Sequence, residues 1–172
     1  MTQTITPLFT REQIAERVRE MGAAIARDYQ GRSPIIVSVL KGSFVFAADL
    51  ARAIDLPVRI EFLGVRSYGQ GTSSTGVVQI THDLQHPIED EDVLLVEDIV
   101  DTGLTVAHLL ELLGTRSPRS IKVCALLHKP ARLVTPVPID YLGFTIEDRF
   151  VVGYGLDRGE AFRNLPYIGV LD

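Results

Sequence analysis

Apolar positions at helical spacing predict a first helix over residues 10–30. Its apolar stripe consists of Ile14, Val18, Met21 and Ile25. Thr10 and Gln13 form a capping-box pattern at its beginning, in which each side chain satisfies a backbone N–H group of the other residue. Gly31 is suited to end the helix, since glycine readily adopts the left-handed conformation common at that position.

Other apolar segments have the length and pattern of β-strands. Three near-continuous runs, typical of strands covered on both faces, occupy residues 34–40, 93–97 and 121–127. Shorter or alternating segments predict strands at residues 58–65, 77–81, 139–144 and 150–154. Helical patterns follow the first two runs, over residues 44–54 and 102–114. This alternation predicts one α/β domain, residues 1–172, with a parallel sheet flanked by helices on both faces.

A polar segment, "RSYGQGTSSTG" at residues 66–76, interrupts this alternation. It predicts a long loop, and long loops in compact domains often act as lids over a binding site. In parallel sheets ligands bind at the carboxyl ends of the strands. That rule points to Lys41 and Gly42, to the stretch from Glu97 to Thr105, and to Lys129.

The composition is ordinary for a globular domain. Hydrophobic residues make up 46% of the 172 residues and charged residues 23%. A chain of this length can bury about 70% of its unfolded surface, so it needs no disulfide or metal to fold. The single cysteine, Cys124, has no internal disulfide partner, which favours a reducing cytoplasm. The first residues lack a secretory pattern, and no apolar run approaches the ~20 residues of a membrane span.

The net charge narrows the classes of ligand. It is −5, with an isoelectric point near 5.4, whereas a nucleic-acid surface needs many Lys and Arg residues on one face. We therefore expect no nucleic-acid partner. A small phosphorylated ligand remains compatible with this charge, because it needs only a few local donors.

The stretch "VLLVEDIVDTGLT", residues 93–105, places carboxylates beside a turn suited to bind an anion. The predicted strand ends at Glu97 and Asp98, and Asp101 follows. The loop and the first turn of the next helix present backbone N–H groups and a partial positive charge. Further donors and a flexible position come from Thr102, Gly103 and Thr105. The pattern predicts a ribose 5-phosphate site, with phosphate on the helix end and hydroxyls or Mg²⁺ on the acids.

Three other interpretations of this stretch fit it less well. The acids could be solvated loop residues and a helix cap, which we would prefer for one acid but not for three. A Walker P-loop is excluded, because its Gly-x-x-x-x-Gly-Lys-Ser/Thr motif is absent. A phospho-acceptor receiver domain is disfavoured, because its acidic pair normally follows the first strand.

The same stretch resembles the phosphoribosyl diphosphate (PRPP) signature of the type I phosphoribosyltransferases, and "EDIVDTG" is most similar to the hypoxanthine-guanine branch. The blocks "VSVLKGSFVFAADL", "VRSYG", "ALLHKPAR" and "RFVVGYGLDRGEAFRNLPYIGVL" resemble that branch as well. The resemblance implies transfer of the phosphoribosyl group from PRPP to hypoxanthine or guanine, with Mg²⁺. It also implies a small hood, built by the N-terminal segment and roughly residues 139–172, and a homodimer or homotetramer.

The resemblance implies roles for individual residues. Asp101 would be the general base or acid at purine N7, and Glu97 and Asp98 would hold the ribose hydroxyls, directly or through Mg²⁺. Lys41, Gly42 and Arg163 would meet pyrophosphate, and the peptide between Leu40 and Lys41 is often cis in this family, although the sequence leaves its isomer open. The PRPP-binding set implied in this way is Lys41, Gly42, Glu97, Asp98, Ile99, Val100, Asp101, Thr102, Gly103, Leu104, Thr105 and Arg163.

The purine and lid residues follow from the same resemblance. Lys129 would donate to purine O6, Phe150 would stack on the base, and Val151 would bond it through its backbone. Asp157 would lie beside the base and join Glu97 and Asp98 as a metal ligand. Ser67 and Tyr68 would lie in the lid.

Each of these residues also has a simpler interpretation. Lys129 could be a solvated loop lysine, Phe150 a core residue, and Asp157 with Arg163 an exposed ion pair. The chain departs from the branch at Leu104, at Gly155 and in "RGEAF". The last two border the base pocket and leave the purine preference open. The alternatives are thus a xanthine-preferring enzyme and a regulator that senses PRPP or nucleotides.

Overall fold

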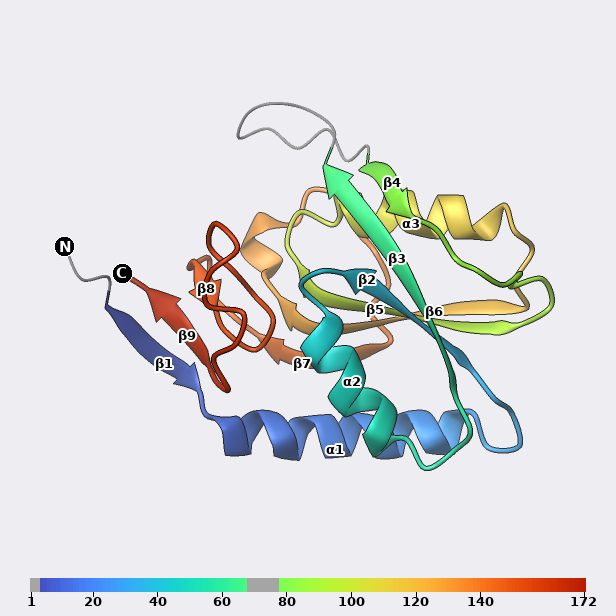
Figure 1. Ribbon diagram of the computed structural model, residues 1–172, viewed down its shortest axis with the longest axis horizontal. Helices are drawn as coiled ribbons and strands as arrows, with labels where there is room; N and C mark the ends of the chain where they lie inside the picture. Colours follow the sequence, from blue (N-terminus) through green and yellow to red (C-terminus); the bar gives the residue numbers. More distant parts are fainter. Residues whose placement is uncertain (1–3, 68–77) are drawn as a thin grey trace.

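The computed structural model describes residues 4–67 and 78–172, and its centre is a six-stranded sheet (Figure 1). The strand order is β4-β3-β2-β5-β6-β7, and every neighbouring pair is parallel except β3 and β4. The strands are β2 (Ile35–Leu40), β3 (Arg59–Ser67), β4 (Val78–His82), β5 (Asp92–Val100), β6 (Ser120–His128) and β7 (Tyr141–Thr145). The predicted parallel sheet is confirmed.

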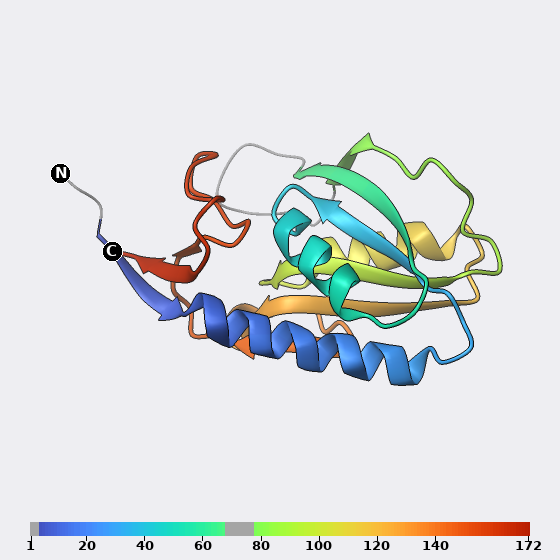
Figure 2. The same ribbon diagram turned by 60° about the horizontal axis from the view of Figure 1, so that its bottom comes forward.

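Helices cover both faces of this sheet, as predicted (Figures 1 and 2). They are α1 (Arg11–Asp28), α2 (Phe44–Ala53), α3 (Leu104–Gly114) and the short 3₁₀ helix η1 (Pro130–Arg132). Buried side chains form two clusters. One joins α1 and α2 to the sheet, and the other joins α3 to the opposite face. In the described ranges no helix is long and apolar enough to cross a membrane.

The predicted capping box begins the first helix. The backbone N–H of Thr10 donates to Gln13 Oε1 at 2.8 Å, and the backbone N–H of Gln13 donates to Thr10 Oγ1 at 3.2 Å. The four apolar residues of the predicted stripe are all buried. The helix ends at Asp28, before the predicted stop at Gly31, whose φ is +79°.

A second, small sheet stands at one end of the molecule. It contains β1 (Ile5–Phe9), β9 (Ile168–Leu171) and β8 (Val151–Val152) in the antiparallel order β1-β9-β8. No strand was identified in the N-terminal segment from the sequence, but the structure has β1 there. Its pairing partner, β9, lies roughly 160 residues away in the chain. Pro7 also argues against a strand in the sequence, because proline is tolerated only where no ladder hydrogen bond is needed, as on this edge.

Several predicted boundaries also need correction. β7 pairs with β6 in the six-stranded sheet, so these residues do not belong to the hood that was placed from about residue 139. β5 continues to Val100, past the predicted end at Glu97. Arg66 and Ser67 belong to β3 instead of the predicted loop, because they pair with β4. The lid residue Tyr68 lies outside the described residues.

Candidate active site

Two carboxylates stand side by side near the carboxyl end of β5. Glu97 is buried and Asp98 partly buried. Burial and the neighbouring charge of Asp98 raise the pKa of Glu97 well above its ordinary value. Burial also raises the pKa of Asp98, although the N–H of Ile99 and the charge of Arg163 act against it. A pair so poorly hydrated favours a cation or a hydroxyl donor as its partner.

The loop between β2 and α2 closes over this pair. A Cβ atom added to Gly42 would lie 1.8 Å from Asp98 Oδ2, so the backbone reaches the carboxylate only because residue 42 has no side chain. The Leu40–Lys41 peptide that precedes it is cis, which settles the isomer that the sequence left open. The structure therefore brings the two segments predicted to bind pyrophosphate and ribose into contact.

The turn of residues 101–103 connects β5 to α3. Gly103 is the N-cap residue with φ +84°, and a Cβ there would lie 2.2 Å from the carbonyl oxygen of Thr135. The N–H groups of Val134 and Thr135 donate to the carbonyl oxygen of Thr102 at 2.9 and 3.0 Å. The first turn of α3 contains no acidic side chain. This helix N-terminus thus has the backbone and charge that a phosphate needs.

The predicted base Asp101 and the predicted purine donor Lys129 lie beside two residues that sequence reasoning missed. Arg132 Nε is 2.7 Å from Asp101 Oδ1. Asp148 is 3.9 Å from both Lys129 Nζ and Arg132 Nη1. Arg132 lies within the quoted block "ALLHKPAR", but its partner is 31 residues earlier in the chain, and no local pattern identifies that pairing.

The simpler interpretations of Lys129 and Phe150 are wrong. Lys129 is only 7% exposed, and its backbone N–H donates to Val100 at 3.0 Å, so it is no solvated loop lysine. Phe150 is 53% exposed and is therefore not a core residue, while Val151 is buried in β8. The backbone of Phe150 is held by the N–H of Leu171 at 3.0 Å. An exposed ring on a fixed backbone is suited to stack on a flat ligand.

A cluster of four charged residues, Lys41, Asp157, Glu160 and Arg163, joins the β2–α2 loop to the C-terminal loop of residues 153–167. Lys41 Nζ is 2.7 Å from Glu160 Oε2. Arg163 Nη2 is 3.0 Å from Glu160 Oε1 and 3.2 Å from Asp157 Oδ1. The two loops can approach this closely only with glycine at residue 155, because a Cβ there would lie 2.4 Å from the carbonyl oxygen of Gly42. Glu160 was not predicted as a site residue.

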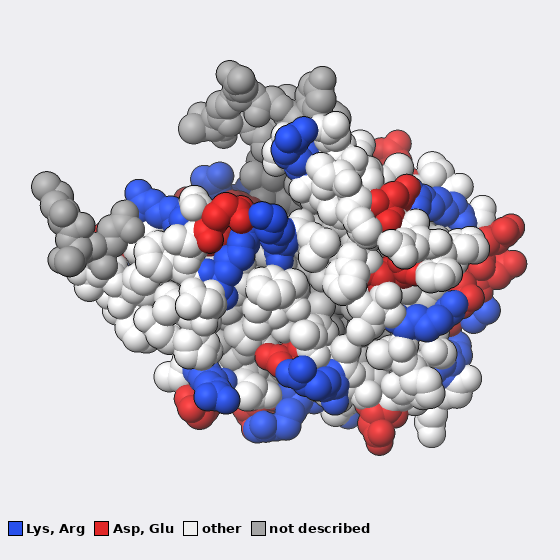
Figure 3. Space-filling model, in the orientation of Figure 1, with Lys and Arg blue, Asp and Glu red and all other residues white. Residues whose placement is uncertain are grey.

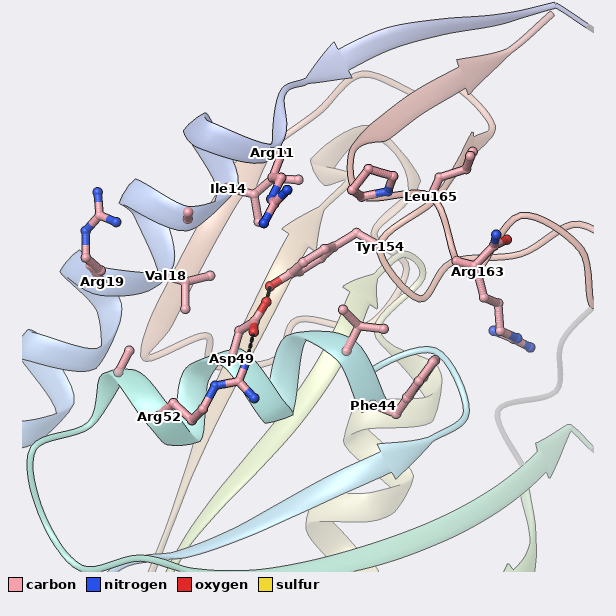
Figure 4. A pocket seen from close by; sticks show the side chains of 15 residues that line it. Arg11, Ile14, Val18, Arg19, Phe44, Asp49, Arg52, Tyr154, Arg163 and Leu165 are labelled. Atoms are coloured by element: carbon pink, nitrogen blue, oxygen red, sulfur yellow. Dashed lines mark hydrogen bonds and ion pairs between the residues drawn. The ribbon is translucent and has the colours of Figure 1, made fainter.

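A cavity of about 760 Å³ lies between α1, α2 and the C-terminal loop, away from the strand ends (Figure 4). Tyr154 reaches across it to Asp49, which also pairs with Arg52. The cavity shares only Arg163 with the charged cluster. Its volume would suit a small ligand, but the acids, the phosphate turn and Lys129 all lie elsewhere. The chemistry therefore places the candidate active site at the strand ends.

Comparison with known proteins identifies the family of this chain. A model of the phosphoribosyl transferase domain family matches residues 6–158. The hypoxanthine-guanine phosphoribosyltransferase of Mycobacterium avium is 51% identical over 171 residues, which cover 96% of this chain and 84% of that protein. The protein of the same name from Dictyostelium discoideum is 49% identical over 168 residues, covering 95% and 93%.

Solved structures agree as well. A hypoxanthine phosphoribosyltransferase from Staphylococcus aureus has a TM-score of 0.94 and 47% identity, covering 96% of this chain and 90% of that one. A hypoxanthine-guanine phosphoribosyltransferase from Bacillus anthracis, with a HEPES molecule in its active site, has a TM-score of 0.95 and 42% identity, covering 98% and 100%. The predicted fold class and the resemblance of "EDIVDTG" are both confirmed, and the chain belongs to the phosphoribosyl transferase domain family.

Proposed function

We propose that the protein transfers the 5-phosphoribosyl group from PRPP to N9 of hypoxanthine or guanine, giving IMP or GMP and pyrophosphate in purine salvage. The observation that carries this proposal is the buried pair Glu97–Asp98 beside the anion-binding turn at the start of α3. The relatives named hypoxanthine-guanine phosphoribosyltransferase match 95–96% of the chain, so the likeness extends over both the acidic pair with its turn and the C-terminal loop.

The proposed roles divide by chemistry. The turn from Asp101 to Thr105 holds the 5-phosphate, and Glu97 and Asp98 hold the ribose hydroxyls. As the bond from ribose C1 to pyrophosphate breaks, positive charge develops on the sugar and negative charge on the leaving group. Lys41 and Arg163 stabilise the leaving group. The new bond forms from C1 to N9, and Asp101 accepts the proton that the purine loses at N7.

Base selection rests on Lys129 and Phe150. An ammonium group has donors only, so it matches the 6-oxo acceptor of hypoxanthine or guanine and is a poor match for the amino group of adenine. Burial of Lys129 makes that distinction sharper, because an unmatched buried donor loses a hydrogen bond to water. The exposed ring of Phe150 stacks on the base.

The donor set fits Mg²⁺ bound together with substrate. In the part of the chain that the structure describes, no group of three or more His, Cys, Asp or Glu side chains forms a metal cage. Mg²⁺ typically takes one or two carboxylates and completes its shell with water and substrate phosphates. Glu97, Asp98 and Asp157 are the candidate ligands, of which one or two would hold the ion at a time, and bound Mg²⁺ would neutralise the diphosphate of PRPP.

Two alternatives use the same site. A xanthine-preferring enzyme would differ only in the base accepted. A regulator would bind PRPP or nucleotides without turnover and bind RNA or DNA, but it would not need a base at residue 101. Lys and Arg side chains are interspersed with Asp and Glu on the face in Figure 3, which disfavours a nucleic-acid surface there.

We also propose that the protein is cytoplasmic and forms a homodimer or homotetramer. Uncharged side chains fill the centre of the face in Figure 3. Phe44 in α2 and Ile60 and Phe62 in β3 are exposed apolar residues. Light scattering after gel filtration measures the mass directly. A mass of 19.0 kDa, that of one chain, at micromolar concentration would refute the oligomer.

The experiment that tests the function is pyrophosphate release from PRPP and Mg²⁺ with hypoxanthine, guanine, xanthine or adenine supplied separately. We expect turnover with the first two and little with adenine. Xanthine as the best substrate would favour the first alternative. Absence of turnover with every base, despite PRPP binding, would favour the regulator.

Asp101→Asn tests the proposed base within that assay. The amide cannot accept the N7 proton, so we expect loss of most turnover while PRPP affinity, measured by calorimetry, stays near that of the wild type. Turnover within a few-fold of the wild type would show that another group accepts the proton.

A further inference from the structure

Glu160 connects the two cations that the proposed function assigns to pyrophosphate. Its two carboxylate oxygens are divided between them, with Oε2 at 2.7 Å from Lys41 Nζ and Oε1 at 3.0 Å from Arg163 Nη2. Lys41 and Glu160 are 119 positions apart in the chain, so the contact is a product of the fold. One carboxylate thus bridges two cations in the way that a phosphate group would.

The backbone around Glu160 holds this carboxylate in place. Glu160 has a positive φ of +70°, which is uncommon for a residue other than glycine. Its N–H donates to Asp157 Oδ2 at 2.8 Å. Arg158 and Ala161 on either side exchange backbone hydrogen bonds at 3.1 Å. These bonds fix the turn, so the side chain starts from a defined position next to both cations.

Arg163 is fixed as well. Its Nη1 donates to the carbonyl oxygen of Gly155 at 2.8 Å, and its side chain is only 18% exposed. Its Nε is buried and has no hydrogen-bond partner among the described residues. The guanidinium therefore has an unused donor besides the one that Glu160 occupies. Glu160 in contrast is 62% exposed, so its side chain can leave without disturbing packing.

The charges of the cluster explain why the contact of Glu160 with the two cations would matter for pyrophosphate. Lys41 and Arg163 are matched by Asp157 and Glu160, so the four side chains carry no net charge together. Pyrophosphate entering such a cluster would meet two carboxylates at close range. Removal of Glu160 from the cations leaves a net positive site, which is what a polyanion requires.

We propose that Glu160 is an internal competitor of pyrophosphate: in the ligand-free protein its carboxylate occupies the position between Lys41 and Arg163 that a phosphate oxygen takes on binding. The inference rests on the proposed function, which assigns these two cations to pyrophosphate. Glu160 returns to the cations when pyrophosphate leaves, so it weakens the hold on product and speeds its release. An exposed ion pair without this role would leave pyrophosphate affinity unchanged when broken.

Calorimetric titration of inorganic pyrophosphate into the whole protein, with and without Mg²⁺, tests this competition. We expect Glu160→Gln to bind pyrophosphate roughly three- to tenfold more tightly than the wild type, the range for loss of two partly exposed ion pairs. The gain should shrink as salt is raised, because screening weakens the competing pairs. Unchanged or weaker binding, or a gain independent of salt, would overturn the proposal.

Glu20→Gln is the matched control. Glu20 is 54% exposed and pairs with Arg17 at 2.7 Å on α1, outside the cluster, so this variant changes net charge equally and should bind pyrophosphate like the wild type. In turnover assays Glu160→Gln should be inhibited by lower concentrations of added pyrophosphate than Glu20→Gln. Pyrophosphate binding without turnover of any purine would refute the proposed function but leave the competition measurable by the same titrations.

Discussion

Gly42→Ala tests whether the β2–α2 loop positions the Asp98 carboxylate. The new Cβ would lie 1.8 Å from Oδ2 and 2.6 Å from Cγ of Asp98. Ordinary contacts of a Cβ atom begin near 3.4 Å. The carboxylate must therefore move by about 1.5 Å, and it can do so by rotation of its own side chain.

The size of the effect follows from which atom moves. Because a terminal carboxylate can rotate away, we expect the free energy of unfolding to fall by less than about 1.5 kcal/mol. A misplacement of about 1 Å in a substrate-positioning group costs roughly 100-fold in rate. Gly42→Ala should therefore lower kcat/KM for PRPP about 100-fold, which corresponds to about 2.7 kcal/mol of transition-state stabilisation.

Steady-state kinetics on a double-mutant cycle isolate the cause. Asp98→Asn should lose PRPP turnover by itself, and Gly42→Ala added to it should cost little more, because the two changes act on one group. Gly114→Ala is the control, since a Cβ there meets nothing within 4 Å. Full additivity of the two changes, or activity of Gly42→Ala within about fivefold of the wild type, would refute this account of Asp98.

The remaining predictions concern the turn, the base platform and pH. Gly103→Ala combines a φ of +84° with a 2.2 Å approach to the backbone of Thr135, so urea unfolding should show a loss of about 2–5 kcal/mol. Phe150→Ala should raise KM for the purine severalfold but change the melting temperature little, because the ring is exposed. Burial raises the pKa of Glu61, but hydrogen bonds from Gln85 N–H and His86 outweigh it, so the pKa lies below the ordinary 4.5. The stability from this depressed pKa is present above pH 4.5 and is lost as pH falls through the folded-state value. His86→Ala should therefore cost about 1 kcal/mol at pH 6 in urea titrations, and the difference should vanish at low pH; a constant difference would contradict it.

Sequence reasoning succeeded where the signal is local. The capping box of Thr10 and Gln13, the continuous run before Glu97 and the glycine at residue 103 each specify structure within a few residues. Their conformations depend on neighbours in the chain, so pattern and backbone chemistry suffice to place them. The strands and helices that bear the acids and the phosphate turn were accordingly predicted.

Pairings between distant segments were not predictable in this way. Arg132 reaches Asp101 and Glu160 reaches Lys41 only after β6 and the C-terminal loop have docked. A surface charge in a sequence has many potential partners, and nothing in its neighbourhood selects one. The exposure of Phe150 is a similar case, since an aromatic residue beside two valines is usually buried.

The pairing of β8 imposes an order on how the site is completed. In the described part of the chain β8 has one strand neighbour, β9, which comes from residues 168–171. During synthesis β2, β5 and α3 are available well before β9 leaves the ribosome, so the elements that hold phosphate and ribose can assemble first. The backbone of Phe150 and of β8 forms its inter-strand hydrogen bonds only after β9 has been synthesised. Lys129, at the end of β6, is thus available before the Phe150 side of the base site is held in place by β9.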